Sequence, residues 1–324
     1  MREVAGAFGL GDVLAVAYLP NGMMNRNWRV ETSSGTYAIK QLRDVEPDPA
    51  RRQHDTIDQL AAAGLPVPRV VRTGEGDSVV EVDGLSYAAS QWMVGEHREG
   101  ATLAIAECVE LGGLLGVLHH ELERVLPDVP DQVEVRVRDH GGAVADAERY
   151  LALIAAKDEP DTFDRLAERG LIEGLELLAK YRDRAPKPDI GGGGWIHGDF
   201  NHFNVLWEAG SVRAVLDWDR LKAAPRGMEV ARAAELLFWQ ETTFDLKRMA
   251  AFIGGYRAVA PIDSSDLLAG LQLRWWNLLC GFWPLDAHYD RNDLTCDHLF
   301  EPRCARLAWW CSHEDELIAA ATAR

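Results

Sequence analysis

The spacing of apolar residues divides the chain into two parts with different periodicities. Up to about residue 94, short runs of alternating apolar and polar residues are separated by turn-forming pairs, a pattern typical of antiparallel strands. A helical pattern interrupts them at 51–63 and stops at Gly64, and a short leading helix is expected within 1–15. We therefore predict a small, mostly antiparallel sheet that carries one main helix. The turn-forming pairs are Asn21-Gly22, Ser34-Gly35 and Asp83-Gly84.

From Ala101 onward the apolar residues recur at helical spacing, with one interruption at 195–218 that reads as strand, loop, strand, tight turn and strand. The pattern predicts a two-lobed α+β fold, with a sheet lobe over 1–94 and a larger, mostly helical lobe over 95–324. The "GGGG" tract at 191–194 has no strand before it and no helix after it, so we expect a flexible connection rather than a phosphate-binding loop. Further helices are expected over 143–157, 161–183, 228–240, 246–258 and 263–283.

Composition narrows the class of protein. The 324 residues are 47% hydrophobic and 26% charged, and no apolar run approaches the roughly 18–20 residues that cross a bilayer. A formal charge of −17 argues against a nucleic-acid partner, because phosphate binding needs a basic surface. An acidic surface attracts a cationic small molecule, or serves solubility alone. Five cysteines, an odd number without a paired framework or export signal, predict a cytoplasmic protein.

A zinc site near the end of the chain is an alternative for three of these cysteines. Histidines lie close to them in sequence, but none of the spacings is the tight Cys-x₂₋₄-Cys of a structural zinc site. We interpret these cysteines as small core side chains. The residues concerned are Cys296, Cys304, Cys311, His298 and His313.

The strongest chemical signal is "HGDFNHFN" at 197–204, followed by "LDWD" at 216–219. If the flanking strands form a hairpin, Asn204 and Asp217 lie at the same end of the sheet with Asp199 opposite them. Amide and carboxylate oxygens suit Mg²⁺, and a carboxylate that does not bind the metal can accept a proton from a hydroxyl group. A lone Asp or Asn in a loop is more often a turn or cap residue, but this combination is what phosphoryl transfer from ATP requires.

This segment resembles the catalytic region of the aminoglycoside phosphotransferase and choline kinase superfamily, a group of protein-kinase-like small-molecule phosphotransferases. The family pattern is His-Gly-Asp, a short variable stretch, Asn, and then Ile/Leu-Asp-Trp/Phe. The resemblance implies a bilobal kinase-like fold, with Asp199 as the catalytic base and Asn204 and Asp217 as Mg²⁺ ligands. It also implies that His197 supports the loop and that Asp219 helps to shape the metal or acceptor site.

The family also requires a lysine on the third strand of the first lobe, where it holds the ATP phosphates. "GTYAIKQLR" supplies Lys40 there, and Lys40 is the only lysine before Lys157. In the family a Glu of the first-lobe helix usually pairs with this lysine. "RRQHDTIDQL" offers only Gln53 or Asp55, so the residue that pairs with Lys40 stays open.

Two more segments resemble the nucleotide-binding parts of the family. "LPNGMMNRNWRV" matches the first hairpin, in which Asn25 falls where the family often has Asn, although a simple turn also accounts for it. "SQWMVGE" matches the hinge between the lobes, where backbone groups of Gln91 and Met93 are expected to meet adenine. The resemblance runs up to about residue 260.

The acceptor side is less defined. The stretch 274–300 is rich in aromatic and acidic residues, and its tryptophans recur at helical spacing, which favours core packing. The alternative is a pocket in which aromatic faces and carboxylates receive an ammonium group. The residues expected at such a pocket are Trp283, Asp286, His288 and Asp290.

The sequence therefore predicts an ATP- and Mg²⁺-dependent phosphotransferase that acts on a hydroxyl of a small, amine-bearing molecule. An aminoglycoside antibiotic, an amino alcohol and an amino sugar all fit this description. A metabolite kinase of the homoserine-kinase type and a catalytically silent nucleotide-binding pseudokinase are the alternatives. A protein kinase is disfavoured by "HGD" in place of "HRD" and by the lack of an activation segment after Asp217.

Overall fold

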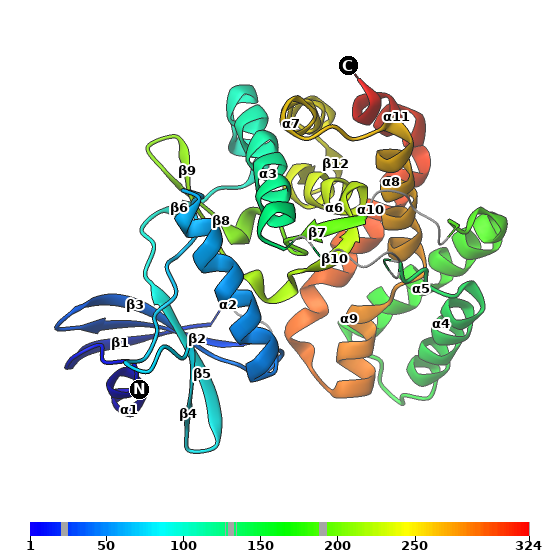
Figure 1. Ribbon diagram of the computed structural model, residues 1–324. Coiled ribbons are helices and arrows are strands. Elements are labelled where there is room, and N and C mark those ends of the chain that lie inside the picture. Colours follow the sequence, from blue (N-terminus) through cyan, green and yellow to red (C-terminus); the bar gives the residue numbers. More distant parts are fainter. Residues whose placement is uncertain (21–24, 127, 129–132, 134, 188–192, 324) are drawn as a thin grey trace. The chain divides into compact units, whose positions relative to one another are not determined.

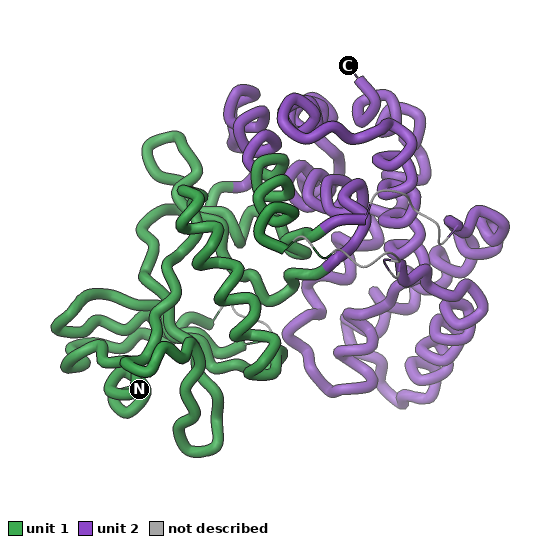
Figure 2. The backbone as a smooth tube through the Cα atoms, viewed as in Figure 1, with its two compact units in different colours: residues 1–98, 115–129, 195–222 green, residues 99–114, 130–194, 223–324 purple. Residues whose placement is uncertain are grey.

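The chain folds into two compact units, each assembled from separate stretches of sequence (Figure 2). Unit 1 comprises 1–98, 115–129 and 195–222, and unit 2 the remainder. The predicted boundary near residue 94 is close to the first passage from unit 1 to unit 2, and the assignment of the two lobes stays a prediction. A computed structural model describes all residues except 21–24, 127, 129–132, 134, 188–192 and 324.

Unit 1 contains a five-stranded sheet in the order β1-β2-β3-β5-β4, with every neighbouring pair antiparallel (Figure 1). The predicted antiparallel sheet is thus confirmed. At the β4–β5 turn, Asp83 and Gly84 both have positive φ, 53° and 71°, as a tight two-residue hairpin requires. The predicted Asn21-Gly22 turn lies outside the described residues. The strands are β1 (Val13–Leu19), β2 (Arg26–Thr32), β3 (Gly35–Gln41), β4 (Val79–Val82) and β5 (Leu85–Gln91).

The helices α1 (Arg2–Ala7) and α2 (Pro47–Ala62) pack against opposite faces of this sheet. Residues of α1 share a buried cluster with Ile39 and Ala89, while α2 belongs to a cluster that contains Ala88. Successive residues of a strand point to opposite faces, so Ala88 and Ala89 mark the two sides. Both faces of the sheet therefore carry apolar residues.

Strand register places Lys40 on the α2 face, because Lys40 pairs directly with Ala88. Helix α2 begins at Pro47, earlier than the predicted start at residue 51, since proline is well tolerated in the first turn of a helix. The leading helix ends at Ala7, well before residue 15, the end of the predicted range, and β1 already begins at Val13.

A second hairpin in unit 1 consists of β8 (Val205–Glu208) and β9 (Ser211–Val215), extended by the short strand β6 (Glu96–His97). Ala209 and Gly210 form its turn, both at positive φ. The hairpin predicted from 195–218 is therefore present.

The chain passes between the units within β7 (Gly193–Ile196) and β10 (Lys222–Pro225). Gly193 and Gly194 belong to strand β7, so the predicted flexible connection is wrong for these two glycines. The other two glycines of the tract lie outside the described residues.

Unit 2 is mainly helical, as predicted. Most of the predicted helices are present with ends that differ by a few residues, as at α5, where Asp161 and Asp164 form a reciprocal capping box. In the described part of the chain, each helix is too short or too polar to span a lipid bilayer. The remaining elements are α3 (Ile105–Val125), which unit 1 shares, α4 (His140–Ala155), α5 (Thr162–Tyr181), α6 (Arg226–Phe238), β11 (Trp239–Gln240), β12 (Thr243–Phe244), α7 (Leu246–Val259), α8 (Ser264–Leu279), α9 (Trp283–Leu285), α10 (Phe300–Ser312) and α11 (Glu314–Thr322).

A buried ionic network joins three of these helices. Glu235 of α6 is 2% exposed and accepts hydrogen bonds from Arg274 of α8 and Arg306 of α10. Burial raises the pKa of Glu235, but the charges and hydrogen bonds of the two guanidinium groups lower it by more than burial raises it. The pKa of this carboxyl is therefore below its ordinary value. The paired carboxylate thus links α6 to both α8 and α10.

Candidate active site

The loop that carries Asp199 lies between β7 and β8, and a buried histidine connects it to the residues after β9. The backbone N–H of Asp199 points to His197 Nδ1 at 3.2 Å, so Nδ1 is the acceptor and the ring proton is on Nε2. His197 Nε2 lies 2.9 Å from the carbonyl oxygen of Leu216 and donates to it. His197 thus joins the loop to the residue before Asp217, and its supporting role stays a prediction.

The loop also requires glycine at position 198. Gly198 has φ +86°, and a Cβ there would lie 2.2 Å from the carbonyl oxygen of Arg220. A larger residue would be strained by its backbone conformation and would collide with the chain after Asp219. The close approach holds the loop against the turn that carries Asp217 and Asp219.

Asn204 orients Asp199. Its Nδ2 donates to both the backbone oxygen and the Oδ2 of Asp199, each at 2.9 Å. Because the amide nitrogen is used in this way, the Oδ1 of Asn204 is turned away from Asp199. The side chain is 8% exposed, so its orientation is fixed by the surrounding protein.

Asp217 is adjacent to Asn204, as the hairpin predicted. Val205 pairs with Val215, and the N–H of Leu216 donates to the backbone oxygen of Asn204 at 2.8 Å. Asp217 itself has φ 60° and ψ 73°, a left-handed conformation that is uncommon for a residue other than glycine. Such strained residues concentrate at functional sites. Its side chain is 45% exposed and accessible to a ligand.

Lys40 reaches the same turn from β3. Its Nζ donates to Asp217 Oδ1 at 2.8 Å and to Asp219 Oδ2 at 2.9 Å. Burial lowers the pKa of Lys40, but the carboxylates of Asp219 and Asp217 raise it more, so the ammonium titrates above its ordinary range. The lysine and the carboxylate required by the family pattern are therefore in direct contact.

The two carboxylates shift in opposite directions. Burial raises the pKa of Asp217, yet the attraction and hydrogen bond of Lys40 outweigh it and hold this pKa below its usual value. The pKa of Asp219 is raised, first by burial and then, against the effect of Lys40, by the neighbouring charge of Asp217. Two carboxylates thus share one ammonium group at this turn.

Asp219 accepts hydrogen bonds from two residues, Asn25 and Gln53, whose contact with it could not be predicted from the sequence. Asn25 Nδ2 donates to Asp219 Oδ2 at 2.6 Å, and Gln53 Nε2 donates to its backbone oxygen at 3.1 Å. Asn25 Oδ1 accepts the N–H groups of Arg43 and Asp44 at 2.8 and 3.3 Å. The side chain of Asn25, a predicted nucleotide contact, is thus engaged by the protein itself.

In the predicted hinge segment, two backbone N–H groups are already hydrogen-bonded within the protein. Gln91 is the last residue of β5, and its backbone N–H donates to the oxygen of Arg69 at 2.8 Å. That N–H is therefore already used within the protein. Met93 follows Trp92, whose N–H donates to the oxygen of Thr36 at 3.1 Å. A role of Gln91 and Met93 at adenine stays a prediction.

The predicted acceptor residues belong to unit 2, where α9 continues into a π-helical turn, Asp286–Asp290. The structure brings two of them together: the hydroxyl oxygen of Tyr150 lies 2.5 Å from Asp286 Oδ1 and 2.9 Å from Asp290 Oδ2, and the two carboxylates share its single proton. Asp290 also pairs with Arg149 at 2.6 Å. π-Helical turns are frequent at functional sites.

The other two acceptor residues lie in different surroundings. His288 Nδ1 is 2.9 Å from Asp297, and the His288 ring stacks on Phe163 with ring centroids 4.3 Å apart. Trp283 is 40% exposed, whereas Trp275 and Trp276 are buried. The core-packing interpretation is thus correct for Trp275 and Trp276, and Trp283 alone among the three has an accessible ring.

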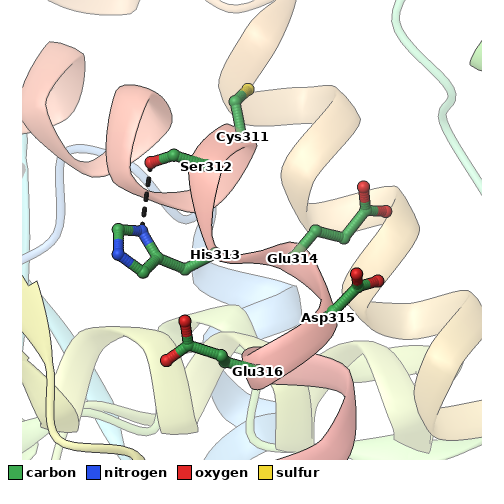
Figure 3. A pocket seen from close by; sticks show the side chains of 6 residues that line it. All are labelled: Cys311, Ser312, His313, Glu314, Asp315 and Glu316. Carbon is green, nitrogen blue, oxygen red and sulfur yellow. Dashed lines mark hydrogen bonds between the residues drawn. The ribbon is translucent and has the colours of Figure 1, made fainter.

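A small hollow on unit 2 does not coincide with any of these residues (Figure 3). Within it, Ser312 Oγ and His313 Nδ1 are 3.0 Å apart, and Glu314 pairs with Arg184. Among the described residues, no group of three His, Cys, Asp or Glu side chains is placed to hold a metal ion. The hollow is lined by Cys311, Ser312, His313, Glu314, Asp315 and Glu316.

Comparison with known proteins places this arrangement in a family. Residues 16–262 match the phosphotransferase enzyme family, and this stretch contains every predicted catalytic, nucleotide-binding and metal-binding residue. The chain belongs to this family. The comparisons confirm the predicted superfamily, the kinase-like α+β fold and the class of ATP-dependent phosphotransferase with an alcohol acceptor, and they are consistent with ATP and a divalent metal ion as cofactors.

Curated relatives include a homoserine kinase of Methylobacillus glycogenes, 22% identical over 284 residues, which cover 85% of this chain and 82% of the relative. An aminoglycoside 3'-phosphotransferase of Streptomyces fradiae is 32% identical over 191 residues, 56% of this chain and 63% of the relative. Among solved structures, an AMP-bound spectinomycin phosphotransferase has a TM-score of 0.67 at 15% identity, covering 95% of this chain and 96% of its own. The last similarity shows the fold.

Proposed function

We propose that this phosphotransferase moves the γ-phosphoryl group of ATP to a hydroxyl of a small molecule that also carries an amine. The observation that supports it best is the contact of Lys40 with Asp217, on the hairpin whose other strand follows the Asp199–Asn204 pair. This constellation supplies a phosphate-binding cation, two oxygen ligands and a separate carboxylate. In-line phosphoryl transfer requires all of these groups.

The metal ligands fit the chemistry of Mg²⁺. Asn204 uses its nitrogen on Asp199, which leaves an amide oxygen as the ligand atom, and Asp217 presents a half-exposed carboxylate beside it. A Mg²⁺ ion held by Asn204 and Asp217 would supply positive charge to the phosphate groups. Lys40 already lies at Asp217 and supplies the remaining positive charge.

Asp199 is proposed to accept the proton of the acceptor hydroxyl. A general base must be held within hydrogen-bond reach of that proton, and the two hydrogen bonds from Asn204 fix the orientation of the carboxylate. His197 fixes the loop backbone at the same residue. These contacts position the base before any substrate binds.

The acceptor is proposed to be cationic. Homoserine and the aminoglycosides, which the relatives' names give as substrates, share a hydroxyl and an amine in one small molecule. The acidic turn of unit 2 suits such an ammonium group, and Asp286 supports this best because its described contact is the neutral hydroxyl of Tyr150. Asp290, in contrast, is paired with Arg149.

The test is ADP release by the purified protein with MgATP and a panel of amine-bearing alcohols. The panel contains homoserine, amino alcohols, amino sugars, spectinomycin and aminoglycosides. We expect one class to stimulate ADP release, and we expect Asp286→Asn to raise the KM for that acceptor without raising the KM for ATP. Stimulation by amine-free alcohols alone would contradict the proposed acceptor class. Nucleotide binding without turnover on any acceptor would favour the pseudokinase.

The five cysteines are all without disulfide bonds, and on this basis we propose a cytoplasmic location.

A further inference from the structure

The nucleotide-binding lysine has no carboxylate partner on helix α2. The helix contains three acidic residues, and each of them faces an arginine. Gln53, the residue of α2 that comes closest to this region in the contacts described, binds the backbone oxygen of Asp219 instead of Lys40. Helix α2 therefore acts on the lysine through the turn after β9. The acidic residues of α2 are Asp48, Asp55 and Asp58.

Lys40 has two carboxylate partners in that turn, and they differ in how they are held. The side chain of Asp217 is 45% exposed, and the proposed function requires it for a metal ion. The side chain of Asp219 is 15% exposed and has a second donor, Asn25 Nδ2, at 2.6 Å on the oxygen that also receives Lys40. Asp219 is thus the more rigid of the two partners.

Asn25 connects this carboxylate to the chain that follows β3. Its Oδ1 accepts the N–H groups of Arg43 and Asp44, close after Lys40 in sequence, while its Nδ2 holds Asp219. Asp44 also pairs with Arg220, the residue after Asp219, at 2.8 Å. Hydrogen bonds from both sides therefore fix Asp219 relative to the strand that carries Lys40.

From these contacts we infer that Asp219 is the positioning residue for Lys40, in place of an acidic residue on α2, and that Asn25 and Gln53 hold it there. This inference rests on the proposed function, in which Lys40 binds the nucleotide phosphates. A lysine side chain is long and loses much of its rotamer entropy when it is ordered. A fixed carboxylate orders Lys40 in advance and leaves its other N–H groups for phosphate oxygens.

The experiment is a double-mutant cycle on nucleotide affinity. Binding of ADP to the full chain is measured by calorimetry for the wild type, Lys40→Ala, Asp219→Asn and the double variant, each with Mg²⁺ and with EDTA. We expect Asp219→Asn to weaken ADP binding by about 10–100-fold, as loss of a residue that orients a ligand does. Added to Lys40→Ala, the same substitution has little further effect, because a positioning residue acts through the lysine.

The arm with EDTA separates this role from metal binding. If Asp219 acts through Lys40, Asp219→Asn weakens metal-free ADP binding as well. An effect confined to Mg²⁺, or an effect that adds fully to that of Lys40→Ala, would overturn the inference. Asp48→Asn is the matched control, because the exposed carboxylate of Asp48 pairs with Arg51 and not with Lys40 or Asp219, and the ADP affinity of this variant should stay at the wild-type value.

Two further outcomes are distinguishable. If Asp219→Asn does not fold, Asn25→Ser replaces it in the same cycle, since it removes the amide that holds Asp219, and the same coupling to Lys40→Ala is expected. If the wild type binds ADP but transfers phosphate to no acceptor, the proposed function fails, while the cycle still reports whether Asp219 positions Lys40.

Discussion

His54 of α2 is near enough to Lys40 and Arg72 to be affected by their positive charges, and its Nδ1 lies 2.9 Å from the hydroxyl of Ser78. Burial, and then the positive charges of Lys40 and Arg72, lower the pKa of His54 to about 4. His54 is therefore neutral in the folded protein well below the pH at which an unfolded chain protonates it.

This shift predicts a loss of stability in mild acid. Between about pH 6.5 and pH 4 the unfolded chain binds a proton at His54 and the folded chain does not, so the free energy of unfolding falls as the pH falls. His54→Gln should remove a pH-dependent contribution on the order of 2–3 kcal/mol between pH 7.5 and 4.5. Urea denaturation at both pH values measures it, with the exposed His120→Gln as control. Equal pH dependence of His54→Gln and the wild type would refute the assignment.

Residue types and spacing predict the Asp199, Asn204, Asp217 and Lys40 set, because the motif is local and the lysine occupies a fixed strand. The partners of Asp219 could not be predicted in this way. Asn25 and Gln53 lie far from Asp219 in sequence, and no local pattern indicates which carboxylate a lysine will meet after folding. The absence of a Glu from α2 was the one available signal that another carboxylate is needed.

At the scale of elements, the loop between β7 and β8 must pass within van der Waals distance of the turn after β9. Gly198→Ala should lower the free energy of unfolding by more than about 1–2 kcal/mol, since the left-handed backbone alone costs that much and the new Cβ meets the oxygen of Arg220. Thermal unfolding and ADP release measure the two consequences, and both the melting temperature and the turnover should fall. Gly74→Ala, with open space at Cβ, is the control. A variant at Gly198 with unchanged stability would contradict the described loop geometry.

Periodicity predicts the antiparallel sheet and most helices of unit 2, since each of these elements buries one regular face. Periodicity does not predict where an element begins when the backbone chemistry of proline or glycine decides its boundary. Pro47 lies in a stretch that reads as a break, yet it begins α2 because the first turn of a helix needs no N–H at that position. Gly193 and Gly194 read as a linker, yet they belong to β7, because a strand depends on backbone pairing as well as on side chains.

At the scale of the whole molecule, the candidate site is assembled within unit 1 from segments far apart in the chain. The stretch 195–222 joins 1–98 in that unit, which is how Asp217 and Asp219 come to lie beside Lys40. Linear sequence alone predicts two lobes but does not predict that the hairpin of β8 and β9 belongs to the same compact unit as the sheet. The formal charge of −17 is consistent with the proposed cationic acceptor.

The most direct measurement of the central claim is acceptor-stimulated ADP release by the wild type and by Asp199→Asn, with MgADP affinity and melting temperature measured on both. Removing the base while keeping the amide shape should reduce turnover by about 10²–10⁴-fold, and it should leave nucleotide affinity and stability near the wild-type values. Phosphoryl transfer that survives Asp199→Asn, or a wild type that binds MgATP but transfers phosphate to no hydroxyl acceptor, would contradict the account.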